Sequence, residues 1–215
     1  MIEIRQVRRA EERETENVIR EAFWNHYAPA ASEHYLIHQM RRSEDYLPAL
    51  DLVTVEDGRI MGNVLSVRSQ ILGDDGHSYE VLTMGPIGVL PSFQGKGAGK
   101  TLIRETMKIA SSLGERAILL TGDPDYYSKL GFIPAETFGI RTKDDMYADF
   151  LLAFELYEGG LSEAGGRYIE NAIYETDEKE VKAFDRDFPK KEIIPGTPGQ
   201  KKLEIMAKRV RPFQK

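Results

Sequence analysis

The sequence predicts an α/β fold in which helices cover both faces of one mixed sheet. Apolar residues alternate between turn signals over residues 50–90, which predicts an antiparallel meander. A helical stretch over 101–113 is followed by the apolar run Ala117–Thr121, which predicts a strand-helix-strand crossover and therefore a parallel pair of strands. The chain has 215 residues and is 41% hydrophobic, which is ordinary for one main domain.

The N-terminal region predicts one strand and two helices. Ile2, Ile4 and Val7 alternate with polar residues, which predicts a short strand buried on one face. The next apolar residues recur at helical spacing, and we expect that helix to end at Pro29. A second helix is predicted over residues 32–43.

Two turns divide the meander that follows. Asp57-Gly58 lies between two apolar runs and predicts a tight hairpin, and residues 73–76 form a second turn. The third strand contains Met84-Gly85-Pro86. Proline cannot donate a ladder hydrogen bond, so a strand that contains it belongs at an edge or a bulge. We therefore expect this strand to splay from its neighbour and to leave a slot beside it.

A glycine-rich turn, Gln94–Lys100, connects that strand to the next helix. The N-terminus of a helix presents unpaired backbone N–H groups and carries about half a positive charge. Glycines let a phosphate approach the peptide plane without meeting a Cβ atom. Lys96 and Lys100 add full positive charges, so the turn is predicted to bind an anion.

These residues can be matched to three patterns of phosphate-binding turn. A P-loop requires G-x-x-x-x-G-K-[ST], and Gly99-Lys100-Thr101 matches its end, but Gln94 stands where the first glycine is required. A dinucleotide fingerprint requires G-x-G-x-x-G, and from Gly95 and Gly97 the third glycine falls on Lys100. The third pattern, Gln/Arg-x-x-Gly-x-Gly/Ala, is met in full by the same segment.

Gln94, Gly97 and Gly99 satisfy this third pattern and resemble the acetyl-CoA pyrophosphate loop of the GNAT N-acetyltransferase superfamily. A second segment, Asp125–Phe132, is similar to the family's later tyrosine-containing segment and lies at the matching distance along the chain. The resemblance covers about residues 1–157. It implies a GNAT-type fold whose mixed sheet is splayed at the acetyl-CoA site, and it implies acetyl-CoA as co-substrate.

The resemblance also implies roles for particular residues. The main chain of Ile87 and Val89 would hold the pantetheine arm as a neighbouring strand would. Tyr127 would act as the general acid that protonates the departing thiolate, since a phenol with a pKa of about 10 is protonated at neutral pH. Packing against the helix over 101–113 is the alternative for Tyr127, and the Tyr126 side chain is expected to point elsewhere. The pyrophosphate loop would comprise Gln94, Gly95, Lys96, Gly97, Ala98, Gly99 and Lys100.

The sequence does not single out a general base. Some members of the family carry a glutamate at the position that Thr83 occupies here, and Glu80 should lie on the opposite face of its strand. Ordered water, Glu21 or a carboxylate on the first two helices remain as alternatives. The resemblance places those helices beside the acceptor entrance. Their aromatic and histidine side chains are therefore either substrate contacts or a core stripe with a solvated edge, and they are Trp24, His26, Tyr27, His34 and Tyr35.

Composition excludes several other chemistries. The absence of cysteine removes disulfides, thiolate metal sites and an acetyl-cysteine intermediate, so acetyl transfer would have to be direct. The net charge of −6 disfavours nucleic-acid binding and mildly favours cationic partners such as protonated amines. His34 and His38 have helical i, i+4 spacing but no third ligand at motif spacing, so no metal is expected. No membrane-length apolar run or signal peptide is present, which predicts a cytoplasmic protein.

The chain is predicted to consist of a GNAT domain over residues 1–157 and a C-terminal extension over 158–215. Paired glycines at 159–160 and 165–166 and a charged run over 175–191 mark the change. We expect the extension to pack either on the domain or on a partner subunit, and the second alternative would make the protein a homodimer. The expected anchors are its apolar residues Tyr168, Ile169, Ile173 and Phe184.

The favoured function is transfer of an acetyl group from acetyl-CoA to a primary amine in a ternary complex. A catalytically idle acyl-CoA sensor or interaction module with the same fold is the alternative. It is compatible with a threonine, and not a carboxylic acid, at position 83. A nucleotide-phosphate hydrolase using Gly99-Lys100-Thr101 is a third class, and it lacks the first loop glycine and an evident partner Asp.

Overall fold

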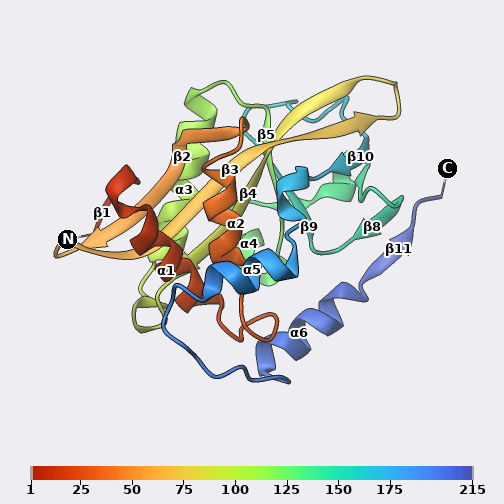
Figure 1. Cartoon of the computed structure of the whole chain (residues 1–215). Coiled ribbons are helices and arrows are strands. Elements are labelled where there is room, and N and C mark those ends of the chain that lie inside the picture. Colours follow the sequence, from red (N-terminus) through yellow and green to blue (C-terminus); the bar gives the residue numbers. More distant parts are fainter. Residues whose placement is uncertain (1, 215) are drawn as a thin grey trace. The chain divides into compact units, whose positions relative to one another are not determined.

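The structure is a computed structural model that describes residues 2–214, and its chain forms two compact units. The first unit contains the residues up to Ser66, together with Gly85–Thr106 and Ala172–Leu203. The second contains Val67–Met84, Met107–Asn171 and the residues from Glu204 onward. Four elements of Figure 1 pass from one unit to the other: strands β3 (Arg59–Gly73) and β4 (Ser78–Val89) and helices α3 (Ala98–Ser112) and α6 (Pro198–Ala207).

The first unit combines the N-terminal helices with one end of the meander. Its other elements are β1 (Glu3–Gln6), α1 (Glu12–Phe23), α2 (Glu33–Met40), β2 (Tyr46–Glu56) and α5 (Glu178–Asp185), with single 3-10 turns at Arg9–Glu11, Pro91–Phe93 and Ala172–Tyr174. β1 pairs with β2 in antiparallel register, Glu3 facing Val55. β2 and β3 form the expected hairpin, in which Asp57 and Gly58 adopt left-handed φ angles of 51° and 76°.

Two expectations about this region were wrong. The first strand is not buried on one face, because Ile2 is exposed and Ile4 is only half-buried on the terminal strand of its sheet. The first helix ends at Phe23, well before Pro29. Asn25 adopts a left-handed φ of 59° and its side chain accepts a hydrogen bond from the Ala30 backbone at 3.0 Å, so a closed turn follows the helix instead.

Helix α1 packs directly on the backbone of β4 within the first unit. A Cβ atom added at Gly88 would lie 2.7 Å from the Ile19 side chain and 2.9 Å from Ala22. Only glycine therefore allows this close approach. Beside it, an apolar cluster made of Val18, Val53, Val55, Ile60 and Leu90, with Val7 and Phe93 at its edge, supports β2, β3 and the end of β4.

The second unit contains the remaining strands. They are β5 (Ala117–Thr121), β6 (Ile133–Pro134), β7 (Ile140–Arg141), β8 (Met146–Ala148), β9 (Leu151–Glu155), β10 (Gly166–Ile169) and β11 (Val210–Pro212), and the short helix α4 (Pro124–Tyr127) follows β5. The order in its main sheet is β3-β4-β5-β9-β6. β4 and β5 are parallel, while β5 and β9 are antiparallel, so the predicted mixed α/β fold is confirmed.

The hydrogen-bonded ladder between β4 and β5 is short. Its register pairs are Leu82 with Ile118 and Thr83 with Leu119, and β4 then continues through Pro86 to Val89. β5 pairs along its whole length with β9 on its other side. The ladder therefore ends before the proline, as expected for a residue that lacks a backbone donor.

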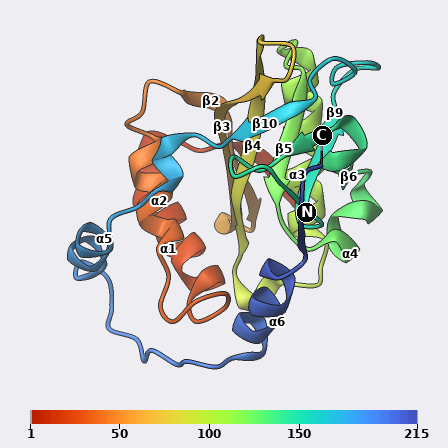
Figure 2. The same cartoon turned by 90° about the vertical axis from the view of Figure 1, so that its right-hand side faces the viewer.

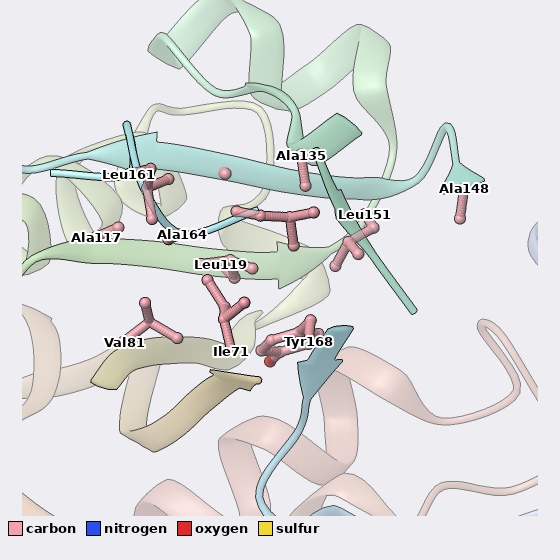
Figure 3. Close-up of a cluster of buried hydrophobic side chains, with 12 residues drawn as sticks. Ile71, Val81, Ala117, Leu119, Ala135, Ala148, Leu151, Leu161, Ala164 and Tyr168 are labelled. Atoms are coloured by element: carbon pink, nitrogen blue, oxygen red, sulfur yellow. The ribbon is translucent and has the colours of Figure 1, made fainter. Parts of the chain in front are cut away.

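The C-terminal extension supplies a strand of the second unit. β10 pairs antiparallel with β3 and parallel with β7. Its Tyr168 is buried in an apolar cluster together with Val81 of β4 and Leu119 of β5, as Figure 3 shows. This core also receives Leu161 and Ala164 from the loop before β10. Among the described residues, no helix has both the length and the apolar character required to cross a membrane.

Candidate functional site

The glycine-rich turn lies at the end of β4 in the first unit. Leu90 donates its backbone N–H to Met61 at 2.8 Å, and Phe93 packs at the edge of the apolar cluster of that unit. Gly95 and Gly97 then adopt left-handed φ angles of 76° and 91°, and α3 begins at Ala98. The sequence pattern strand, glycine turn and helix is therefore realised as predicted, because only glycine adopts two such angles without strain.

The turn is open to solvent. Gln94 through Gly97 and Lys100 are exposed, whereas Ala98 is buried under the start of the helix. A Cβ atom added at Gly95 or Gly97 would have no neighbour within 4 Å. The first N–H groups of α3 have no partner inside the helix, so this open space adjoins backbone donors at the positive end of a helix dipole. That geometry suits a phosphate or diphosphate.

Two side chains of the turn fold back on the protein. The Gln94 side-chain amide donates to the Val89 carbonyl at 3.0 Å, which fixes the turn relative to β4. The Lys96 ammonium lies 5.0 Å from the centre of the Phe93 ring, at cation–π distance. The Gln94 side chain therefore holds the turn against β4 in this structure, and the exposed groups of the turn are mainly its backbone and its lysines.

The end of β4 has one covered and one accessible face. Gly85, Ile87 and Val89 are partly exposed, while Pro86 and Gly88 between them are buried. Alternate residues of a strand point to opposite faces, so Ile87 and Val89 share the accessible face. α1 covers the other face at Gly88. The Tyr174 hydroxyl, from the C-terminal extension, donates to the Gly85 carbonyl at 2.6 Å.

Tyr127 lies at the end of α4 in the second unit. The Asp123 carboxylate caps this helix by accepting from the Asp125 backbone at 3.0 Å. The Tyr127 ring packs edge-on against Phe132, with centroids 5.7 Å apart, and an added Cβ at Gly122 would collide with it. The Tyr126 ring packs edge-on against that of Tyr127, with centroids 5.0 Å apart, and burial raises the pKa of Tyr126.

The acids considered as general base each have a partner. Glu21 on α1 forms an ion pair with Lys191 at 2.7 Å, and Glu80 on β4 pairs with Arg68 at 2.8 Å. Thr83 is buried, and its hydroxyl joins Ser69, at 2.5 Å, to the Tyr168 hydroxyl. The Tyr168 hydroxyl is therefore the group that adjoins Thr83. Burial raises the pKa of this phenol.

His34 and His38 contact different carboxylates. His34 is fully buried, with Nε2 3.1 Å from Asp185, and this burial lowers its pKa to about 4. His38 lies 2.8 Å from Glu16. Within residues 2–214, no group of three or more His, Cys, Asp or Glu side chains is arranged to hold a metal ion.

The sequence predicted that the C-terminal extension packs on the domain or on a partner subunit, but not which of its residues contact α1 and α2. We call residues 185–200 the strap; in Figure 2 it runs from α5 to α6. Its Asp185 binds the buried Arg20 guanidinium through contacts of 2.5 and 3.1 Å. The Trp24 indole donates to the Glu192 carbonyl at 2.8 Å. Trp24 and His34, two of the residues expected either to contact substrate or to form a core stripe, thus contact the extension. The only sequence signal for a covering segment was the number of aromatic residues around them.

Residues 20–132 match the acetyltransferase (GNAT) family, a range that includes the accessible face of β4, the glycine-rich turn and Tyr127. The chain belongs to the GNAT acetyltransferase family. The strap lies outside the matched range.

Two curated relatives of this GNAT protein come from Escherichia coli. The uncharacterized N-acetyltransferase YjhQ of strain K12 is 30% identical over 46% of this chain and 54% of its own length. The uncharacterized N-acetyltransferase YhbS of the same strain is 29% identical over 52% of this chain and 65% of its own length. The chain therefore matches between about half and two thirds of each relative.

Two solved structures share the fold over most of this chain. The crystal structure of YhbS from Escherichia coli in complex with CoA has a TM-score of 0.71 and 21% identity, covering 81% of this chain and 92% of that one. A GNAT family acetyltransferase from Brucella melitensis in complex with acetyl-CoA has a TM-score of 0.66 and 23% identity, covering 81% of this chain and 99% of that one. Both likenesses establish the GNAT fold.

Proposed function

We propose that this protein is an acetyl-CoA-dependent N-acetyltransferase that transfers an acetyl group to a primary amine by direct attack in a ternary complex. The observation that carries the proposal is the open glycine-rich turn at the start of α3, next to a strand whose Ile87 and Val89 share an accessible face. The complexes of YhbS with CoA and of the Brucella protein with acetyl-CoA support the choice of co-substrate.

The proposed co-substrate contacts are mostly main-chain contacts. Backbone N–H groups of the turn, with Lys96 and Lys100, hold the pyrophosphate, and the peptide groups of Ile87 and Val89 hold the pantetheine arm. The turn residues assigned to this role are Gln94, Gly95, Lys96, Gly97, Ala98, Gly99 and Lys100. Side-chain substitutions at Ile87 or Val89 should therefore have little effect unless the backbone moves.

The chemical step needs a neutral amine and a protonated leaving group. The amine nitrogen attacks the thioester carbonyl, a C–N bond forms and the C–S bond breaks. Tyr127 donates its phenolic proton to the departing thiolate, and the proton lost by the amine passes to solvent. The chain contains no cysteine that could carry an acetyl group between the two substrates.

The test compares Tyr127→Phe with its neighbour Tyr126→Phe, using thiol release from acetyl-CoA against a panel of primary amines. Loss of a general acid lowers rates by 10²–10⁴-fold, so we expect kcat to fall about 100-fold in Tyr127→Phe, with KM for acetyl-CoA nearly unchanged. Tyr126→Phe should keep the wild-type rate. A wild-type kcat in Tyr127→Phe would contradict the assigned role.

A catalytically idle acyl-CoA sensor is the second candidate, and the observation favouring it is that a hydroxyl network occupies the Thr83 position. Tight CoA binding without turnover of any amine would support the sensor. Cytoplasmic location, the homodimer and the boundary of the GNAT domain at residue 157 stay predictions.

A further inference from the structure

A lysine of the strap occupies a site made of one carboxylate and one indole ring. The Lys191 ammonium lies 2.7 Å from Glu21 Oε2 and 5.5 Å from the centre of the Trp24 ring. Glu21 and Trp24 are one turn apart at the end of α1. A carboxylate beside an aromatic face is the arrangement by which proteins recognise alkylammonium groups.

The backbone next to Lys191 is fixed by hydrogen bonds. The Glu192 carbonyl accepts from the Trp24 indole at 2.8 Å and from the Asn25 side-chain amide at 2.9 Å. The Lys191 side chain is 27% exposed and that of Glu21 is 33% exposed, so both are largely withdrawn from water. Lys191 therefore extends from a fixed point of the strap onto the α1 site.

A second cation on the same ring has a different role. The Arg20 guanidinium lies 4.2 Å from the Trp24 ring and 3.9 Å from Glu21, but it is 1% exposed and is bound by Asp185. Arg20 thus belongs to the packed interior of the first unit. The partly exposed Lys191 is the cation that an external amine could replace.

The site lies on the side of α1 that faces away from β4. Ile19 and Ala22, whose side chains contact β4 at Gly88, lie on the opposite side of the helix from Glu21 and Trp24. The site is therefore separate from the strand to which the co-substrate role is assigned.

We propose that Glu21 and Trp24 form a binding site for a primary ammonium on an unbranched alkyl chain, and that Lys191 occupies it as an internal ligand. The inference concerns binding alone and does not depend on the proposed function. Lys191 competes with an external alkylammonium group, and removing the Lys191 charge frees the site.

The binding experiment uses Lys191→Met, which keeps most of the alkyl stem and removes the charge, with Lys190→Met at the exposed neighbouring lysine as matched control. The probe is Nα-acetyl-lysine methylamide, and Nα-acetyl-norleucine methylamide is the uncharged control. Trp24 is the single tryptophan of the chain, so its fluorescence reports occupation of the site directly.

A partly exposed ion pair and a cation–π contact together should weaken binding of a competing ammonium group about fivefold to twentyfold. We therefore expect Lys191→Met to bind the lysine probe at least fivefold more tightly than wild type, while Lys190→Met behaves as wild type. Glu21→Gln combined with Lys191→Met should abolish the gain. Unchanged or weaker binding in Lys191→Met, or equal binding of the norleucine probe, would overturn the inference.

Discussion

The glycine-rich turn and the strap both belong to the first unit, and they are built in opposite ways. The turn is made of backbone groups and open space, with glycines at 95 and 97 in left-handed conformation. The strap is held by side chains that reach residues about 170 positions away, such as Arg20 to Asp185 and Lys191 to Glu21. The turn thus has unused donors at a helix end, whereas the groups of the strap satisfy one another.

This difference indicates different uses. Unpaired backbone N–H groups that face solvent have a small free-energy cost in the free protein, because water solvates them. They are also available to an anionic ligand. Paired side chains stabilise one position of a segment and must separate before anything else can bind there. We therefore expect substitutions in the turn to change affinity for CoA, and substitutions at the strap to change stability and access.

The largest expected effect is the loss of CoA affinity in Gly97→Ala. The new Cβ atom enters the open space beside the first N–H groups of α3 and keeps a phosphate away from them. Two weakened charge-assisted hydrogen bonds correspond to about 3 kcal/mol, or about a 100-fold rise in the dissociation constant for CoA. Calorimetric titration with CoA measures it.

Gly114→Ala is the matched control for that variant. Gly114 lies just after the end of the same helix with a φ of 78° and, like Gly97, has no neighbour within 4 Å of an added Cβ. Both variants therefore carry a similar conformational cost of about 1–2 kcal/mol. Equal CoA affinity in the two variants would show that strain, and not the phosphate space, explains any effect at Gly97.

The same contrast explains which features the sequence could predict. The hairpin at Asp57-Gly58, the parallel crossover and the glycine-rich turn depend on neighbouring residues, since turn chemistry and hydrophobic period are local. The early end of α1 at Phe23 was missed because a left-handed Asn25 is not distinguishable from a helical asparagine by periodicity. Pro29, the visible breaker, lies beyond that turn.

The contacts of the strap were beyond prediction for a different reason. A charged run over 175–191 has the composition of a solvated surface, and nothing in it specifies that Asp185 meets Arg20 or that Lys191 meets Glu21. Burial of His34 depends on Phe184 and Phe188, which come from the far end of the chain. Such pairs are decided by tertiary packing.

Tyr168 and Phe184, expected as anchors, do pack on the helices and strands of their own units.

The next largest effect is expected at Asn25, where α1 meets the strap. Its side chain accepts from Ala30 and Ile194, both at 3.0 Å, and donates to Glu192 at 2.9 Å. Asn25→Gly keeps the left-handed backbone and loses these bonds, at about 2 kcal/mol, while Asn25→Ala adds about 1 kcal/mol of backbone strain. Urea unfolding measures both.

Limited trypsin digestion at Lys190 and Lys191 separates the two contributions to Asn25. If the side chain holds the strap, both variants should be cut faster than wild type to a similar degree, because both lose the bonds to Ile194 and Glu192. Faster cutting in Asn25→Ala alone would mean that backbone conformation at the end of α1, and not the side chain, positions the strap.

The smallest expected effect is a dependence of stability on pH that arises at His34. Burial holds its pKa at about 4, below the value of 6.5 of an unperturbed histidine, although Asp185 raises it and Arg20 and Arg13 lower it further. The unfolded chain therefore binds a proton more readily than the folded chain below pH 6.5. The stabilisation is complete above pH 6.5 and is lost as the pH falls towards 4. For one such group the loss between pH 7 and pH 5 is about 2 kcal/mol.

His34→Gln should remove this part of the pH dependence, whereas His77→Gln, at an exposed histidine, should leave it. Urea unfolding at pH 7 and pH 5 gives the difference directly. The result reports on this region of the first unit, because Asp185 and the rings of Phe184 and Phe188 bury His34.

A second variant, Asp185→Asn, removes the charge that favours protonation of His34. The pKa of His34 should therefore fall further, and the loss of stability should extend to lower pH. An unchanged slope in His34→Gln would mean that the strap does not keep this histidine from water, and that its docking is looser than the ion pairs to Arg20 and Glu21 imply.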